Sequence, residues 1–163
     1  MNNNLEISEL DRQFMRMACD IASENIDHGG GPFGAVIVKD GKIISTGGNT
    51  VTIDNDPTAY AEMNAIRRAC SRVGNFKLDG CVIYSSCEPC PMCLSALYWA
   101  GISRIYYANT KNDAHDIDFD DSLIFQEINK PISERSIPCI HIDDPHAIDH
   151  FHKWQKNTDK VKY

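Results

Sequence analysis

The chain has 163 residues, carries a net charge of −7 and is 42% apolar, which excludes a disordered polymer and is typical of one globular domain. No apolar run approaches the length of a membrane span, and no Lys or Arg run supplies the basic face of a nucleic-acid binder. We therefore expect neither membrane insertion nor an RNA or DNA substrate. Residues 1–5 lack the basic patch and apolar core of a signal peptide, so we also expect a cytoplasmic protein.

The first half of the chain predicts a helix, a β-hairpin and a second helix. Ser8 and Asp11 have the spacing of a capping box, and apolar residues then recur at helical intervals until the glycines before Pro32. Asp40 and Gly41 lie between two β-branched runs and form a strong hairpin turn signal. These signals predict a helix over residues 10–26, strands over 33–38 and 42–46, and a helix over 58–70.

The second half of the chain predicts further strands and helices. Residues 81–85 are apolar almost throughout, as in a strand that is buried on both faces. Pro91 suits the first turn of a helix, and Gly101 suits its end. Residues 109–121 are polar and rich in Asp, which predicts an irregular loop. The remaining elements are a helix from about residue 90 to 100, strands over 102–108 and 137–142, and a helix over 146–156.

This order of elements predicts an α/β fold. Strands separated by helices imply parallel neighbours, and the leading hairpin adds an antiparallel pair. We expect a three-layer α/β/α sandwich around a central mixed five-stranded sheet, formed by residues 1–163 as a single domain without internal repeats.

The cysteines carry the first chemical signal. There are seven, and an odd number with three between residues 87 and 93 is a poor disulfide framework, so metal binding or catalysis is favoured. Cys90 and Cys93 share one face at a helix start, where the helix dipole favours thiolate. Alone, this pair is ambiguous: two buried cysteines or a thioredoxin-like redox pair would show the same spacing.

A second motif, upstream, decides between these interpretations. Zinc-dependent nucleobase deaminases carry H-x-E followed by P-C-x-x-C. Here the second half is intact around Cys90 and Cys93, and the first half is intact at Glu62 but has Tyr60 in the histidine position. The chain resembles this superfamily, and the bacterial guanine deaminases most of all, over nearly its whole length. The strings that carry the resemblance are GGPFGAV (30–36), NDPTA (55–59), SCEPCPMC (86–93), FDDS (119–122) and the terminal KY (162–163).

The resemblance implies a cytidine deaminase-like fold and hydrolytic deamination of guanine to xanthine and ammonia. One Zn²⁺ per subunit would be held by Cys90, Cys93 and the residue in the Tyr60 position, and would lower the pKa of a bound water. Glu62 would be the catalytic proton shuttle rather than a metal ligand. Without the motif, Glu62 would be interpreted as a solvent-exposed residue in the first turn of a helix.

The resemblance also implies purine contacts. Asn49 would hydrogen-bond the purine, and Asp121 would accept a hydrogen bond from the amino edge of guanine. Phe33 and Trp99 would form the wall of the pocket. By themselves these residues allow plainer interpretations: Asn49 is a turn residue, Asp121 belongs to an acidic loop, and Trp99 could equally be core.

The resemblance further implies a homodimer. In guanine deaminases of this type the C-terminal segment, here about residues 143–163, exchanges onto a partner subunit and closes its pocket. Tyr163 would then reach the substrate from the other chain.

Tyr60 is the departure from the family pattern. Catalytic zinc takes three protein ligands, whereas a phenol has a pKa near 10 and is longer than imidazole. Three outcomes follow: weak zinc binding through Cys90, Cys93 and water, Tyr60 as a poor third ligand, or an empty and inactive site. We expect weakened zinc binding and reduced deamination. Of the histidines, His28 alone is worth checking as a replacement ligand.

Two other functions remain open from the sequence. One is a related deaminase acting on guanosine, cytosine or tRNA adenosine, the last disfavoured by the acidic charge. The other is an inactive purine-binding or structural homologue, which Tyr60 supports.

Overall fold

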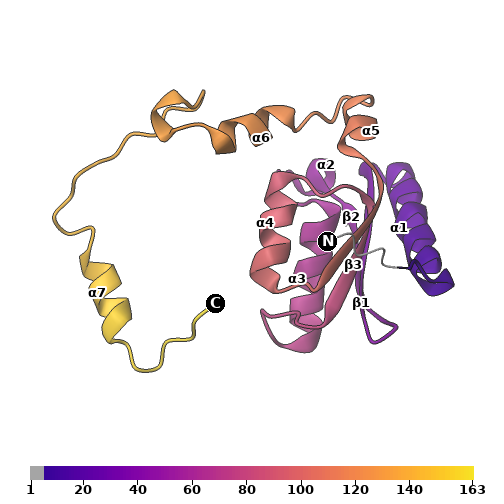
Figure 1. Cartoon of the computed structure of the whole chain (residues 1–163), viewed down its shortest axis with the longest axis horizontal. Helices are drawn as coiled ribbons and strands as arrows, with labels where there is room; N and C mark the ends of the chain where they lie inside the picture. The colour runs from indigo at the N-terminus through magenta and orange to yellow at the C-terminus, as the bar shows by residue number, and fades with distance from the viewer. Residues whose placement is uncertain (1–5) are drawn as a thin grey trace. The chain divides into compact units, whose positions relative to one another are not determined.

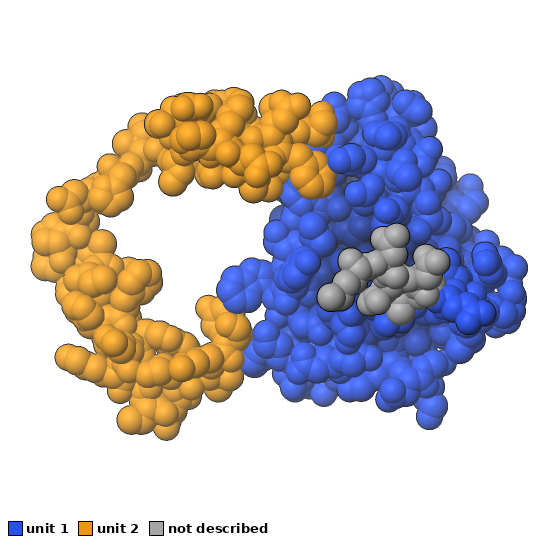
Figure 2. All heavy atoms as spheres, viewed as in Figure 1, with its two compact units in different colours: residues 1–121 blue, residues 122–163 orange. Residues whose placement is uncertain are grey.

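The computed structural model describes residues 6–163 and divides into two compact units (Figures 1 and 2): an N-terminal unit, Met1–Asp121, and a C-terminal unit, Ser122–Tyr163. Residues 1–5, on which the expectation about a signal peptide rests, lie outside the described residues. Within residues 6–163 no helix has the length and apolar character needed to cross a membrane.

The first helix, α1 (Glu9–Asp27), begins as predicted. Ser8 is its N-cap: Asp11 N–H donates to Ser8 Oγ over 3.1 Å, and Ser8 N–H donates to Asp11 Oδ2 over 2.8 Å. This reciprocal pair satisfies two of the backbone donors that a helix start leaves free. The helix buries the face that carries Phe14, Ala18 and Ala22.

Strands β1 (Gly31–Lys39) and β2 (Lys42–Asn49) form the predicted hairpin. Asp40 and Gly41 both have positive φ, 49° and 71°, as the favoured two-residue hairpin turn requires. Strand β3 (Cys81–Cys87) pairs antiparallel with β1, and β4 (Arg104–Asn109) pairs parallel with β3. The order is β2-β1-β3-β4.

The prediction of a fifth strand is wrong for this structure. Within the described residues the mixed sheet has four strands, and residues 137–142 are irregular. Ile137, Ile140 and Ile142 are 77%, 84% and 79% exposed. A strand forms only where a neighbouring strand takes up its backbone hydrogen bonds, and apolar, β-prone residues cannot supply that partner themselves.

Helices cover both faces of the sheet (Figure 1). α1 lies on one face, and α3 (Ala61–Val73) and α4 (Pro91–Ala100) lie on the other. Gly47 lets α3 approach β2 closely, because a Cβ there would collide with the carbonyl oxygen of Ala61. This contact fixes the start of α3 against the sheet. The predicted three-layer arrangement is therefore present in the N-terminal unit.

Two short helices complete the N-terminal unit: α2 (Val51–Asp54) and α5 (Lys111–His115). The second corrects the prediction of an irregular loop over residues 109–121. Thr110 caps α5, since Asp113 N–H donates to Thr110 Oγ1 and Thr110 N–H donates to Asp113 Oδ2 over 2.7 Å. The polar residues that suggested a loop are thus partly helix-capping residues.

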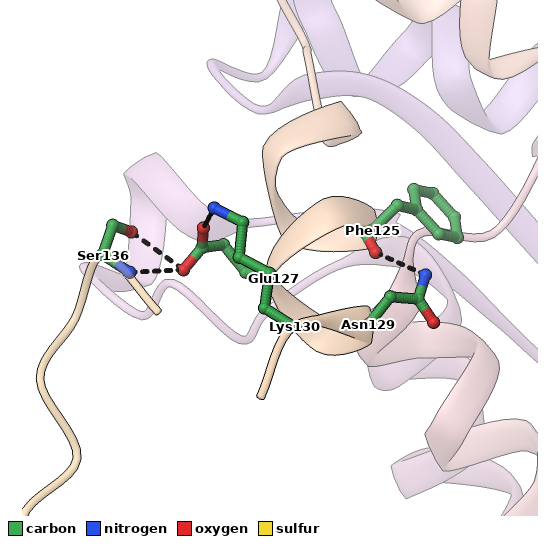
Figure 3. Close-up of polar contacts among 5 residues, drawn as sticks. All are labelled: Phe125, Glu127, Asn129, Lys130 and Ser136. Atoms are coloured by element: carbon green, nitrogen blue, oxygen red, sulfur yellow. Dashed lines mark hydrogen bonds and ion pairs between the residues drawn. The ribbon is translucent and has the colours of Figure 1, made fainter. Parts of the chain in front are cut away.

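The C-terminal unit contains α6 (Ser122–Asn129), a 3₁₀ turn, η1 (Ile132–Glu134), and α7 (Asp149–Lys156), none of which has a buried residue. Figure 3 shows polar contacts among five of its residues. Glu127 accepts from Lys130 Nζ over 2.6 Å and from Ser136 N–H over 2.6 Å, and Asn129 Nδ2 donates to the carbonyl of Phe125. Local hydrogen bonds rather than an apolar core define this unit.

Candidate active site

The first turn of α3 carries a buried carboxylate. Tyr60 is the N-cap of this helix and Glu62 is its second residue, with only 6% of Glu62 exposed. Ser85 Oγ donates to Glu62 Oε1 over 3.0 Å, and Cys93 Sγ donates to Glu62 Oε2 over 3.5 Å. Glu62 is therefore held between a strand hydroxyl and a thiol of the next helix.

The start of α4 supplies two thiols. Cys90 is the N-cap, Pro91 occupies the first turn as predicted, and the Cys93 N–H donates to Cys90 Sγ over 3.5 Å. Cys93 is fully buried, whereas Cys90 is half-buried. The structure thus brings the carboxylate of Glu62 and the Cys90–Cys93 pair together, at the amino ends of two neighbouring helices.

The protonation of this group follows from burial and hydrogen bonding. Burial raises the pKa of Glu62, although its hydrogen bonds, including that from Ser85, oppose the shift. A side-chain hydrogen bond between the two thiols lowers the pKa of Cys90, and this bond, together with burial, raises the pKa of Cys93. Of the two thiols, Cys90 is therefore the more acidic.

Tyr60 does not offer the donor that a catalytic zinc takes. Burial raises the pKa of its phenol, and the negative charges of Cys90 and Cys93 add to the shift. Among the described residues, no three His, Cys, Asp or Glu side chains are grouped closely enough to hold a metal. His28 does not replace the missing ligand, because it caps the end of α1 with its Nδ1 2.8 Å from the carbonyl oxygen of Glu24. Two thiols fit zinc, and the third protein ligand is not an imidazole.

Two of the predicted purine contacts lie in the N-terminal unit. Asn49 ends β2, is 4% exposed, and accepts from Val51 N–H through Oδ1 over 3.2 Å. Phe33 lies in β1 and meets Phe119 edge to face, with the ring centroids 4.9 Å apart. Their contact with a purine stays a prediction.

The other three predicted purine contacts, Asp121, Trp99 and Tyr163, lie in different parts of the structure. Asp121 lies near enough to Tyr60 for its charge to raise the pKa of that phenol, and burial raises the pKa of Asp121 itself. Trp99 is on the last turn of α4, at the opposite end from Cys90, and is 65% exposed, so the alternative that it is core is wrong. Tyr163 belongs to the C-terminal unit and is 75% exposed.

Sequence reasoning missed Ser85, which holds Glu62. The alternation of β3 contains the signal, because Ser85 lies on the same face as the buried residues Cys81 and Ile83. A hydroxyl among buried apolar residues needs a hydrogen-bond partner. It also missed Phe119, whose ring covers Phe33.

Residues 8–109 match the family model described as the cytidine and deoxycytidylate deaminase zinc-binding region. The chain belongs to this family. That match confirms the resemblance drawn from the motifs, and it contains Tyr60, Glu62 and the Cys90–Cys93 pair.

Relatives within the family are similar over different lengths. Guanine deaminase of Bacillus subtilis (strain 168) is 49% identical over 151 residues, which are 92% of this chain and 97% of the relative. A solved structure of guanine deaminase from Bacillus subtilis superposes with a TM-score of 0.91 at 48% identity, covering 93% of this chain and 98% of that one. The tRNA-specific adenosine deaminase of Aquifex aeolicus is 42% identical over 95 residues, 58% of this chain and 63% of the relative. The similarity to guanine deaminase thus extends into the C-terminal unit.

Proposed function

We propose that the protein is a zinc-dependent guanine deaminase, which hydrolyses guanine to xanthine and ammonia. The observation that carries the proposal is the buried Glu62 in hydrogen-bond contact with Cys93, at the amino ends of α3 and α4. The extent of the similarity to Bacillus subtilis guanine deaminase supports guanine as the substrate.

The residues of the site have distinct tasks in this reaction. Cys90 and Cys93 would hold the zinc ion, which when bound supplies an activated water for attack on the purine carbon that bears the amine. Glu62 takes the proton of the water and passes protons to the ring nitrogen and the leaving amine. Burial raises its pKa, which favours a carboxyl group that can hold a proton as well as release one. Ser85 fixes Oε1, and Oε2, which accepts from the Cys93 thiol, would become free for proton transfer once Cys93 loses its proton to bind zinc.

Binding of the purine rests on one aromatic wall and two polar groups. Phe33, backed by Phe119, offers an apolar face for the ring. Asn49 is buried and its amide donates to ring acceptors, while Asp121 accepts from the amino edge that distinguishes guanine from hypoxanthine. Trp99 of the same chain and Tyr163 of a partner subunit complete the proposed set.

We also propose a homodimer that exchanges its C-terminal segment, about residues 143–163. At one sheet edge, Arg68 and Arg72 of α3 donate to the carbonyls of Thr46 and Ile44 in β2, over 2.9 and 3.0 Å. These arginines protect that edge against strand addition. Within the described residues β4 has a neighbour on one side only, so its free edge is the one that can accept a strand.

Residues 137–142, which directly precede the exchanged segment and carry exposed isoleucines, would provide such a strand as the segment crosses from a second copy. Sedimentation velocity of the full chain tests the dimer. Ile140→Lys should shift the dimer to monomer, whereas a sedimenting monomer in the unchanged protein would contradict the proposal.

The cysteines support a cytoplasmic location. All seven lie within residues 6–163, and none is paired in a disulfide. Unpaired thiols are the rule in the reducing cytoplasm.

The activity is tested by ammonia release from guanine, guanosine, cytosine and adenine with zinc added. Guanine should be the best substrate, and Glu62→Gln should lower turnover by about 10²–10⁴-fold because the proton shuttle is lost. Faster release from one of the other bases would contradict guanine as the substrate.

Tyr60 favours a second candidate, an inactive purine-binding homologue. Calorimetry with guanine beside turnover of the same zinc-loaded sample separates the two. Binding without ammonia release would establish the second candidate.

A further inference from the structure

The Cys90–Cys93 pair has the arrangement of a dithiol that can close into a disulfide. Cys90 is the N-cap of α4 and Cys93 its third residue, and the Cys93 N–H donates to Cys90 Sγ over 3.5 Å. Both residues lie in one helical turn, with the Cys-x-x-Cys spacing of disulfide oxidoreductases. Closing the bond therefore requires side-chain rotation and no movement between elements.

The two sulfurs differ in access. Cys90 is half-buried, whereas Cys93 has no exposed surface. A soluble reagent thus reaches Cys90 first. Behind the pair, Glu62 Oε2 accepts from Cys93 Sγ over 3.5 Å, so a proton acceptor already contacts the thiol that must react second.

We propose that the metal-free protein undergoes thiol–disulfide exchange at Cys90 and Cys93 with a low-molecular-weight disulfide, and so stores a reversible Cys90–Cys93 bond. Cys90 sulfur attacks one sulfur of oxidised glutathione, whose S–S bond breaks and releases one glutathione thiolate. Cys93 passes its proton to Glu62 and attacks Cys90 Sγ, which displaces the second glutathione. The two cysteines lose two electrons, and one glutathione disulfide becomes two thiols.

Tyr60 is the reason to expect this reaction in this chain. A zinc ion held by three protein ligands keeps both thiolates bound and unavailable to an oxidant. Here the third position carries a phenol, so the metal-free state is populated at zinc concentrations that would fill a complete site. The inference depends on the two thiols and not on guanine as substrate, so turnover of the zinc-loaded protein tests the two separately.

The experiment uses the full chain after dialysis against a chelator. The protein is equilibrated with mixtures of reduced and oxidised glutathione, quenched with acid, alkylated and mapped by fragment mass spectra. Closure of the Cys90–Cys93 bond, with loss of two hydrogens and reversal by reduced glutathione, is the expected result. Saturating zinc should prevent it, and Tyr60→His should be protected at lower zinc than the unchanged protein.

Three variants make the order of attack testable. Cys93→Ser should retain one glutathione on Cys90, because the displacing thiol is missing. Cys90→Ser should lower modification of Cys93 at least about tenfold, since Cys93 has no exposed surface for a soluble reagent to reach. Cys139→Ala removes an exposed cysteine and should leave the yield of the Cys90–Cys93 bond unchanged.

The proposal is overturned if both thiols of the unchanged protein remain alkylatable in fully oxidised glutathione. It is overturned equally if glutathione accumulates on Cys90 without closing the bond, or if Cys93 reacts as fast in Cys90→Ser. The unchanged protein decides the first two outcomes, so a variant that fails to fold does not affect them.

Discussion

Replacing Tyr60 by histidine should strengthen zinc binding. Tyr60 is the N-cap of α3 with extended φ and ψ of −74° and 159°, and its side chain makes no capping hydrogen bond, so the exchange costs no bond at this helix start. Loss of an outer-shell partner alone lowers metal affinity about 10–100-fold. A third protein ligand should therefore raise zinc affinity at least about 100-fold, which corresponds to about 2.7 kcal/mol.

Zinc affinity is measured by competition with a chromogenic chelator on metal-free protein, and kcat/KM for guanine is measured on the same samples. Tyr60→Phe is the matched control, because it keeps the ring and removes the oxygen; it should bind zinc as the unchanged protein does. Equal zinc affinity in Tyr60→His and the unchanged protein would refute the argument about the third ligand. A lower affinity in Tyr60→Phe would instead make the phenol oxygen a ligand.

Three further predictions concern Ser85, Asp11 and Gly47. Ser85→Ala removes a hydrogen bond that lowers the pKa of Glu62, so the acid limb of the kcat/KM profile for guanine should move up by about one pH unit; an unmoved limb would exclude this role. Hydrogen bonds from Ser8 and then Tyr84 hold the pKa of Asp11 below its ordinary 3.8. The stability they provide is present above pH 3.8 and is lost as pH falls through the lower folded value. Asp11→Ala should thus lower the free energy of unfolding, measured in urea, by about 2 kcal/mol at pH 7 and by progressively less in acid. An equal loss at pH 7 and in acid would contradict this pH dependence. Gly47→Ala should lower stability by about 1–3 kcal/mol in thermal unfolding, because the added Cβ meets the backbone of Ala61 and Ala65; an unchanged midpoint would show that α3 can shift.

The parts of the fold that the sequence predicted correctly depend on local chemistry. The capping box of Ser8 and Asp11 and the turn at Asp40 and Gly41 are encoded within a few residues, and both are present. Residues 137–142 have the composition of a strand, but a strand also needs a partner elsewhere, which composition does not specify. The same limit applies to α6, which was not predicted at all.

In the candidate site, too, residues of local motifs were predicted, whereas residues placed by strand pairing or helix length were not. The motif residues Glu62 and Cys93 were predicted to meet, and they lie in hydrogen-bond contact. Ser85 was not predicted, because its role depends on the register that pairs β3 with β1 and turns its hydroxyl toward α3. Trp99 was assigned from its residue type, and its position at the far end of α4 depends on helix length rather than on any motif.

The acidic groups of the site and the phenol of Tyr60 together make zinc binding depend on pH. Glu62, Cys90 and Cys93 are three neighbouring acidic groups in a region where burial penalises charge. Without a cation, the hydrogen bond with Cys90 and burial raise the pKa of Cys93. Zinc must displace the proton of this thiol, so its affinity should rise with pH. A neutral imidazole at residue 60 would add a ligand without adding charge, whereas a phenol must lose a further proton beside groups that already oppose its ionisation. The cost of Tyr60 is therefore greatest in the same low-pH range in which the metal-free dithiol is most populated.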